Sequence, residues 1–166
     1  MERREIALIA IALIAVGLLA TKGAEAAVVA LRKPEGRLEE WEDLIQRYAA
    51  IFNVPSPLIK AIIMVESSGK AFVSRKENGY YSYGLMGVTL PTARDMGFSG
   101  NPSQLFDPEI NIYYGVKYLR WLMDRPYIDN NIERIAAGYN AGPDLTPWPS
   151  KYIEKVKYWI KKFEGG

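Results

Sequence analysis

The chain has 166 residues, a length that suits one domain of ordinary size and a short additional segment. It contains neither cysteine nor histidine, which excludes disulfide bonds, thiolate metal sites and nucleophile–histidine arrangements. Acid–base chemistry near neutral pH therefore falls to carboxyl, tyrosine or lysine side chains. The 21 basic residues exceed the 19 acidic ones by two, and this excess lies within residues 1–37. Residues 38–166 are neutral and have no basic run, so no nucleic-acid partner is expected.

Residues 1–26 are predicted to be a signal or membrane-anchor segment. Arg3 and Arg4 precede an uncharged stretch at 6–20, and Ala-Glu-Ala at 24–26 has the small-x-small form of a signal-peptidase site. The uncharged stretch suits a signal peptide and is shorter than the roughly 20 residues that an untilted transmembrane helix needs. The segment therefore indicates that the chain is directed to a membrane.

Two interpretations of this segment stay open. Apolar residues return at 26–31, which favours an uncleaved anchor with its arginines on the cytoplasmic side over a cleaved signal. A soluble helix is the least favoured interpretation, because no polar face is visible. Residues 27–37, with Pro34 and Gly36, are predicted to be a linker. Under both leading interpretations the domain works in the cell envelope, outside the cytoplasm.

Two helices are predicted next. Apolar residues recur at spacings of three and four between residues 38 and 52 and predict a helix that ends at Asn53–Pro55. Ser56 is expected to cap a second helix, with Pro57 as its first residue and Gly69 at its end. The second helix is apolar on nearly all sides, which predicts a central, buried position.

The remaining residues predict a loop region and further helices. Residues 70–90 contain the turn signal Asn78-Gly79 and favour a loop or short hairpin. Helical signals return at 91–96, from Asp107 to Pro126, at 132–140 after a cap at Asn131, and after a cap at Ser150. Residues 38–166 are therefore predicted to form one mainly α-helical domain.

Glu66 is the leading candidate for a chemical role. It follows Ile62 and Ile63 by four and three residues, so its carboxyl group shares the apolar face of the second helix. Desolvation and the negative end of the helix dipole both disfavour the charged form, which predicts a raised pKa that suits a general acid. Taken alone, the pattern fits a glutamate that points into solvent equally well.

Four motifs supply the context for Glu66. They are ESSG at 66–69, GLM at 84–86, DPEINIYYGVKYLRWLMDR at 107–125 and GYNAG at 138–142. In order and approximate spacing they resemble the soluble lytic transglycosylase family of the lysozyme-like superfamily, which is related to goose-type lysozymes. The resemblance covers about residues 40–163 and implies a lysozyme-like catalytic domain. It also implies cleavage of the β-1,4 bond between N-acetylmuramic acid and N-acetylglucosamine in peptidoglycan.

The resemblance implies a mechanism that needs only one carboxyl group. A single glutamate first protonates the leaving oxygen and then acts as the base that lets the muramoyl 6-hydroxyl close a 1,6-anhydro ring. No second carboxylate accompanies Glu66 in a motif, as a glycosidase with two carboxylates would require. No metal or cofactor is implied. The implied partners are peptidoglycan strands, the membrane through residues 1–26, and an envelope-spanning or virion assembly.

Individual roles follow from matching positions. Glu66 matches the catalytic acid/base and Tyr139 the tyrosine that orients it, although core packing is an alternative for Tyr139. The matched substrate-binding positions are Ser74, Gly84, Met86 and Asn140, and Tyr83 is a candidate for stacking on a sugar ring.

One departure affects the sugar-binding loop. Gly87 stands where the family usually has glutamine, so the contacts with the glycan are expected to differ. Two alternative functions stay open, a goose-type hydrolase that admits water and a non-catalytic peptidoglycan-binding or structural module.

Overall fold

The computed structural model describes residues 38–77 and 79–165, and the predicted segments 1–26 and 27–37 lie outside them. The elements in chain order are η1 (Leu38–Trp41), α2 (Glu42–Phe52), α3 (Ser56–Ser67), β1 (Ser74–Glu77), β2 (Tyr80–Tyr83), β3 (Val88–Thr89), α4 (Leu90–Asp95), η2 (Pro102–Phe106), α5 (Pro108–Met123), α6 (Ile132–Ala141) and α7 (Ser150–Glu164). The predicted mainly α class is confirmed. In this part of the chain, no helix combines the length and the apolar character needed to cross a bilayer.

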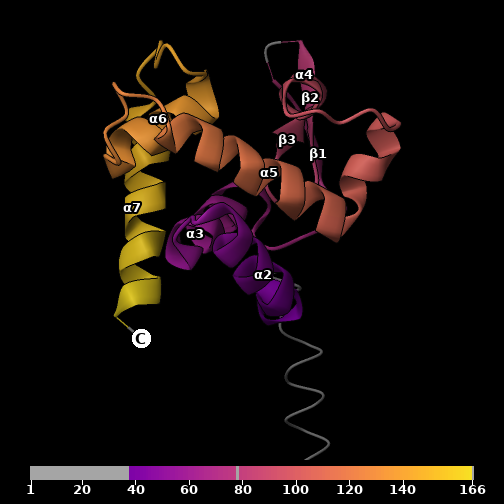
Figure 1. Ribbon diagram of the computed structural model, residues 1–166, viewed down its shortest axis with the longest axis horizontal. Helices are drawn as coiled ribbons and strands as arrows, with labels where there is room; N and C mark the ends of the chain where they lie inside the picture. The colour runs from indigo at the N-terminus through magenta and orange to yellow at the C-terminus, as the bar shows by residue number, and fades with distance from the viewer. Residues whose placement is uncertain (1–37, 78, 166) are drawn as a thin grey trace, which may run out of the picture. The chain divides into compact units, whose positions relative to one another are not determined.

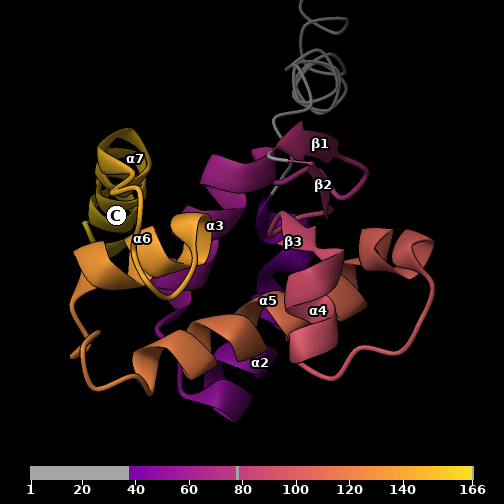
Figure 2. The ribbon, with the colours of Figure 1, turned by 90° about the horizontal axis from the view of Figure 1, so that it is seen from above.

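Helix α3 runs through the middle of the domain. Figures 1 and 2 show α6 and α7 on one side of it and the strands on the other. It packs against α7 and α2, and its side chains from Leu58 to Ile63 are fully buried apart from Lys60. The predicted central, buried helix is confirmed, and it lies between α6 and α7 on one side and the strands on the other.

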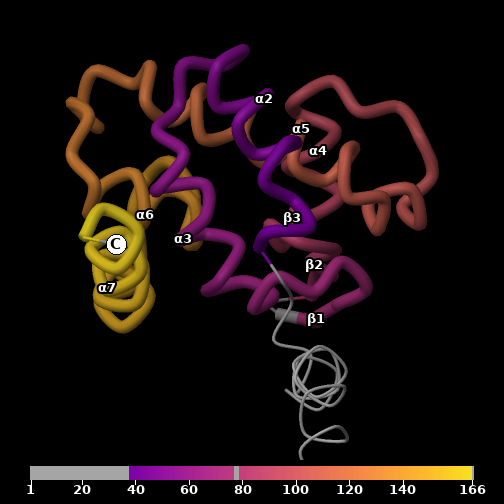
Figure 3. The backbone as a smooth tube through the Cα atoms, turned by 90° about the horizontal axis from the view of Figure 1, so that it is seen from below, coloured from indigo at the N-terminus to yellow at the C-terminus, as the bar shows by residue number. Residues whose placement is uncertain are grey.

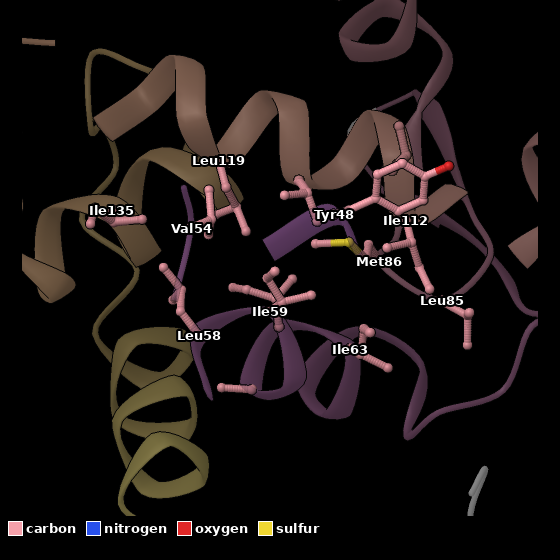
Figure 4. Packing of buried hydrophobic residues seen from close by; sticks show 14 of the residues in the cluster. Tyr48, Val54, Leu58, Ile59, Ile63, Leu85, Met86, Ile112, Leu119 and Ile135 are labelled. Carbon is pink, nitrogen blue, oxygen red and sulfur yellow. The ribbon is translucent and has the colours of Figure 1, made fainter. Parts of the chain in front are cut away.

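The core joins α3 to α5. Figure 4 shows Ile59 and Ile63 pointing from α3 toward α5, with the side chain of Met86 between the two helices. Gly115 of α5 makes room for that side chain, because a Cβ atom at this position would lie 2.5 Å from the Met86 sulfur. The motif residue Met86 therefore belongs to the core, with no exposed surface.

The strands form a small antiparallel sheet in the order β1-β2-β3. Ser74 pairs with Tyr83 across the first two strands, and Tyr83 pairs with Val88 across the last two. Figure 3 shows the chain passing from the end of α3 into this region. The predicted hairpin is confirmed, while the third strand, with two residues, is too short to leave a periodic signal in the sequence.

Helix boundaries agree with the sequence where a side chain caps the helix. Asp107 accepts a hydrogen bond from the Ile110 N–H, and Asn131 accepts hydrogen bonds from the N–H groups of Glu133 and Arg134. The caps predicted at Ser56 and Ser150 are wrong. Each serine is already the first helical residue, follows a proline, and makes no cap hydrogen bond.

The predicted end of the second helix is also shifted by one residue. Ser68, with φ of 54°, occupies the left-handed C-cap position, and Gly69 follows it.

Candidate active site

Glu66 lies in the last turn of α3 and is half-buried. The Tyr152 hydroxyl, from the first turn of α7, donates a 2.7 Å hydrogen bond to its Oε1 atom. The other carboxyl oxygen lies against the turn between β2 and β3, where a Cβ atom built on Gly87 would be 2.5 Å from Oε2. The carboxyl group is thus held between α7 and this turn.

The turn between β2 and β3 is fixed from inside the domain by Asn111 of α5. This fully buried side chain accepts a 2.8 Å hydrogen bond from the Met86 N–H. Its amide nitrogen donates to the carbonyl oxygens of Tyr83 and Leu105. Gly84 is needed here, since its φ is +69° and a Cβ atom would lie 2.5 Å from the Asn111 amide nitrogen.

Tyr139 of α6 holds the same turn from another side. Its hydroxyl donates a 2.8 Å hydrogen bond to the Met86 carbonyl oxygen, which belongs to the peptide group that precedes Gly87. Burial raises the pKa of Tyr139 well above its usual value, and the nearby charge of Glu66 adds to the effect. Tyr139 therefore lies close to Glu66, and its hydroxyl proton is directed to the main chain of the turn.

Ser67 joins the end of α3 to the turn. This buried residue places its hydroxyl 2.8 Å from the Leu85 carbonyl oxygen. This hydrogen bond ties the residue next to Glu66 to the turn and so helps to fix the backbone that carries the carboxyl group.

Tyr152 is a neutral hydrogen-bond donor over the whole physiological range. Burial raises the pKa of its hydroxyl well above the usual value, and the charge of Glu66 raises it further. A phenol of this kind can position a carboxyl group and stabilise its ionised form without adding a charge. The pair can therefore support proton transfer to and from a bound molecule.

The predicted substrate-binding residues occupy different environments. Ser74 is exposed at the start of β1, and Asn140 is exposed near the end of α6. Met86 has no exposed surface, and both of its main-chain groups are bonded within the domain, so this residue presents no group to a glycan.

Tyr83 belongs to an aromatic group beside the sheet. Its ring lies 5.4 Å from the Phe106 ring in an edge-to-face arrangement, and Phe106 in turn stacks on Phe72, whose surface is 85% exposed. Tyr83 also lines a pocket of about 360 Å³ with Tyr80, Tyr81 and residues of α4. A larger groove of about 720 Å³ between α6 and α7 contains none of the predicted site residues.

Sequence reasoning missed Tyr152 as a partner of Glu66. The two residues are 86 positions apart and meet only because α7 packs on α3. Asn111 was recognised only as part of a motif. Its signal was a polar residue next to Ile112 on an otherwise apolar helix face, which is the pattern of a buried side chain that bonds to the backbone.

Comparisons with known proteins agree with the motifs. The model of the transglycosylase SLT domain family matches residues 43–158. Membrane-bound lytic murein transglycosylase F of Vibrio cholerae is 37% identical over 116 residues, which is 68% of this chain and 20% of that protein. Membrane-bound lytic murein transglycosylase E of Buchnera aphidicola is 35% identical over 95 residues, which is 53% of this chain and 42% of that protein.

Solved structures show the same fold. The 70 kDa soluble lytic transglycosylase of Escherichia coli superposes with a TM-score of 0.64 at 25% identity, over 75% of this chain and 24% of that one. An inactive mutant of lytic transglycosylase Slt from Pseudomonas aeruginosa gives 0.65 at 21% identity, with the same coverage. The match thus covers less than half of each of these named proteins.

Proposed function

Because the chain belongs to the transglycosylase SLT domain family, we propose that it is a peptidoglycan lytic transglycosylase. It cleaves the β-1,4 bond between N-acetylmuramic acid and N-acetylglucosamine and leaves 1,6-anhydromuramoyl ends. The observation that carries the proposal is the half-buried carboxyl group of Glu66, hydrogen-bonded by Tyr152 at 2.7 Å and packed against the turn that contains the GLM motif.

Glu66 acts twice in the proposed reaction. As an acid it gives its proton to the glycosidic oxygen, and the bond from that oxygen to C1 of the muramoyl residue breaks. As a carboxylate it then takes the proton of the muramoyl 6-hydroxyl, whose oxygen bonds to C1. Glu66 ends protonated again, now with the proton of the 6-hydroxyl, and no water is consumed, so one carboxyl group is sufficient.

Tyr152 supports the first step, the proton transfer from Glu66, through one hydrogen bond. A hydrogen bond from a neutral donor is stronger to a carboxylate than to a carboxylic acid. The bond therefore strengthens as Glu66 releases its proton, which lowers the energy of the transition state more than that of the bound substrate. Tyr139 contributes indirectly, because it holds the Met86 carbonyl group of the adjacent turn.

The glycan is proposed to contact the surface around the turn and the sheet. Ser74 and Asn140 offer exposed polar groups, and Tyr83 offers an aromatic ring next to the exposed ring of Tyr81. Gly84 and Met86 are buried and their main-chain groups are bonded within the domain, so their proposed role is to shape the turn beside the glycan. Aromatic rings and hydrogen-bonding groups in combination suit a sugar chain, which has apolar faces and hydroxyl edges.

The proposed location is the cell envelope, outside the cytoplasm. The relatives from Vibrio cholerae and Buchnera aphidicola carry the word membrane-bound in their names, and residues 1–26 of this chain have the composition of a signal or anchor. Fractionation of cells that express the full chain tests this location. Recovery in the cytoplasmic fraction would contradict it.

Mass spectrometry of digested peptidoglycan tests the activity. The full chain is expected to release anhydromuropeptides, and Glu66→Gln is expected to release none. The matched control is Asp95→Asn, which removes an exposed carboxyl group on α4 and should leave the product pattern unchanged. Activity in Glu66→Gln equal to that of the unmodified chain would exclude Glu66 as the acid.

The same experiment separates the alternatives. A goose-type hydrolase would release products that are heavier by one water molecule than the anhydro products. A non-catalytic module would bind purified peptidoglycan sacculi and release neither product.

A further inference from the structure

Gly87 is in direct contact with the proposed acid. An ideal Cβ atom on this residue would lie 2.5 Å from Oε2 of Glu66, 2.9 Å from its Cδ and 3.1 Å from its Cγ. In proteins, a Cβ atom essentially never lies closer than 3.0 Å to a heavy atom of a residue that is not its neighbour in the chain. The space that any side chain at position 87 would need is therefore occupied by the Glu66 carboxyl group.

The backbone of Gly87 cannot move aside easily. The preceding residue, Met86, is held at its N–H by Asn111 and at its carbonyl oxygen by Tyr139, both at 2.8 Å. The Met86 side chain is buried in the core. A side chain introduced at position 87 would therefore displace the Glu66 carboxyl group and leave the turn in place.

Tyr152 and Gly87 act on opposite oxygens of this carboxyl group. The Tyr152 hydroxyl donates to Oε1, which favours Oε2 as the oxygen that carries the proton in the acid form. Oε2 is also the atom closest to the missing side chain of Gly87. A Cβ atom at position 87 would therefore push away the oxygen from which the proton leaves.

We propose that Gly87 is a positioning residue, whose missing side chain lets the Glu66 carboxyl group rest against the turn with Oε2 placed for proton transfer. The inference rests on the proposed function, since it concerns the same acid. Asn111 and Tyr139 then act through this residue, because they fix the turn against which the carboxyl group rests.

The size of the required displacement sets the expected effect. Ordinary contact begins at 3.4 Å, so Oε2 would have to move by about 0.9 Å in Gly87→Ala, and a misplacement of about 1 Å can cost 10²-fold in rate. We expect kcat to fall at least about tenfold, with KM changed less than about twofold, because the variant alters the acid and not the sugar contacts.

The matched control is Gly97→Ala. Gly97 also has a positive φ, of +94°, and the nearest atom to a Cβ there is the flexible end of Lys117 at 3.9 Å. This variant carries the backbone strain of alanine in the left-handed region without the contact. Its kcat should equal that of the unmodified chain. Gly87→Asn is a second variant at the site itself, because asparagine tolerates positive φ and still introduces the Cβ atom.

A double-mutant cycle separates positioning from a general structural effect. Gly87→Ala and Tyr152→Phe both act on the Glu66 carboxyl group, so their effects on kcat should not multiply. The effects of Gly97→Ala and Tyr152→Phe should multiply. All rates are measured well below the lowest thermal midpoint of the set, so that every variant is folded.

The outcomes are distinct. The absence of anhydro product from the unmodified chain would reject the proposed function, and anhydro product from Glu66→Gln would exclude Glu66 as the acid. An inactive Glu66→Gln together with Gly87→Ala and Gly87→Asn that retain kcat within about twofold would reject only the role of Gly87. Multiplicative effects of Gly87→Ala and Tyr152→Phe would also reject it, since the residue would then act elsewhere.

Discussion

Tyr152→Phe removes one hydroxyl group and leaves the ring that packs between α7 and α3. The lost interaction is the 2.7 Å hydrogen bond to Oε1 of Glu66. A hydrogen bond to a charged group contributes about 1.5–3 kcal/mol and one between neutral groups about 0.5–1.5 kcal/mol. As Glu66 passes from acid to carboxylate, the bond therefore gains about 1–1.5 kcal/mol.

Only this difference in hydrogen-bond energy between the acid and the carboxylate changes the rate, because the rest is present before the reaction starts. Because about 1.4 kcal/mol corresponds to a factor of ten, we expect kcat to fall about tenfold in Tyr152→Phe. KM should change little, since the same hydrogen bond is weaker in the ground state, where the carboxyl group is protonated. The assay is the initial rate of anhydromuropeptide release from purified peptidoglycan as a function of its concentration.

Tyr158→Phe is the matched control on the same helix. Tyr158 is 56% exposed, and its ring contacts Trp159. Loss of the Tyr158 hydroxyl group should leave kcat unchanged. An unchanged kcat in Tyr152→Phe, or a loss confined to KM, would refute the argument that this hydroxyl stabilises the developing carboxylate.

Three further predictions concern stability. Asn111→Ala leaves the buried Met86 N–H and Leu105 carbonyl groups and the partly buried Tyr83 carbonyl group without their partner. At about 1 kcal/mol or more for each buried group, we expect urea unfolding to show that the free energy of unfolding falls by about 2–3 kcal/mol; a fall below about 1 kcal/mol would contradict this account. Burial raises the pKa of Tyr118 from 10.0 to about 12, so its contribution is fully present below pH 10 and is lost as the pH rises toward 12. The free energy of unfolding falls by up to about 3 kcal/mol over this range. Tyr118→Phe should show a correspondingly smaller loss in alkaline unfolding curves, and identical curves would contradict the assignment. Asp107→Ala removes the N-cap of α5 and should lower the free energy of unfolding by about 1 kcal/mol while leaving kcat unchanged at low temperature; a fall in kcat there would mean that the cap also shapes the site.

The sequence predicted those parts of the site that depend on local pattern. The spacing of Glu66 from Ile62 and Ile63 placed its carboxyl group on the apolar side of α3, and the helix is central and buried as expected. Asp107 and Asn131 each stand directly before a helical segment. Their side-chain oxygens can therefore accept hydrogen bonds from the N–H groups of the first turn, which marks both positions as helix starts in the sequence.

The rest depends on contacts between distant segments. The hydrogen bond from Tyr152 requires the packing of α7 on α3, which no periodicity within α7 predicts. Sequence reasoning treated Gly87 as the loss of a sugar-binding side chain, and only the position of the Glu66 carboxyl group shows that a side chain would collide there. At Ser56 and Ser150 the residue type suggested caps, but both serines are already helical, so their hydroxyl groups do not serve the first turn.

The place of Tyr152 in the last helix has a consequence for biosynthesis. The proposed proton donor on α3 is synthesised first, and the phenol that is hydrogen-bonded to it follows 86 residues later. An unfinished chain, or one clipped by a protease ahead of residue 150, would carry an intact glutamate that lacks its hydroxyl partner. We therefore expect the proposed glycan-cleaving activity to develop fully only after α7 has been synthesised and has packed on α3.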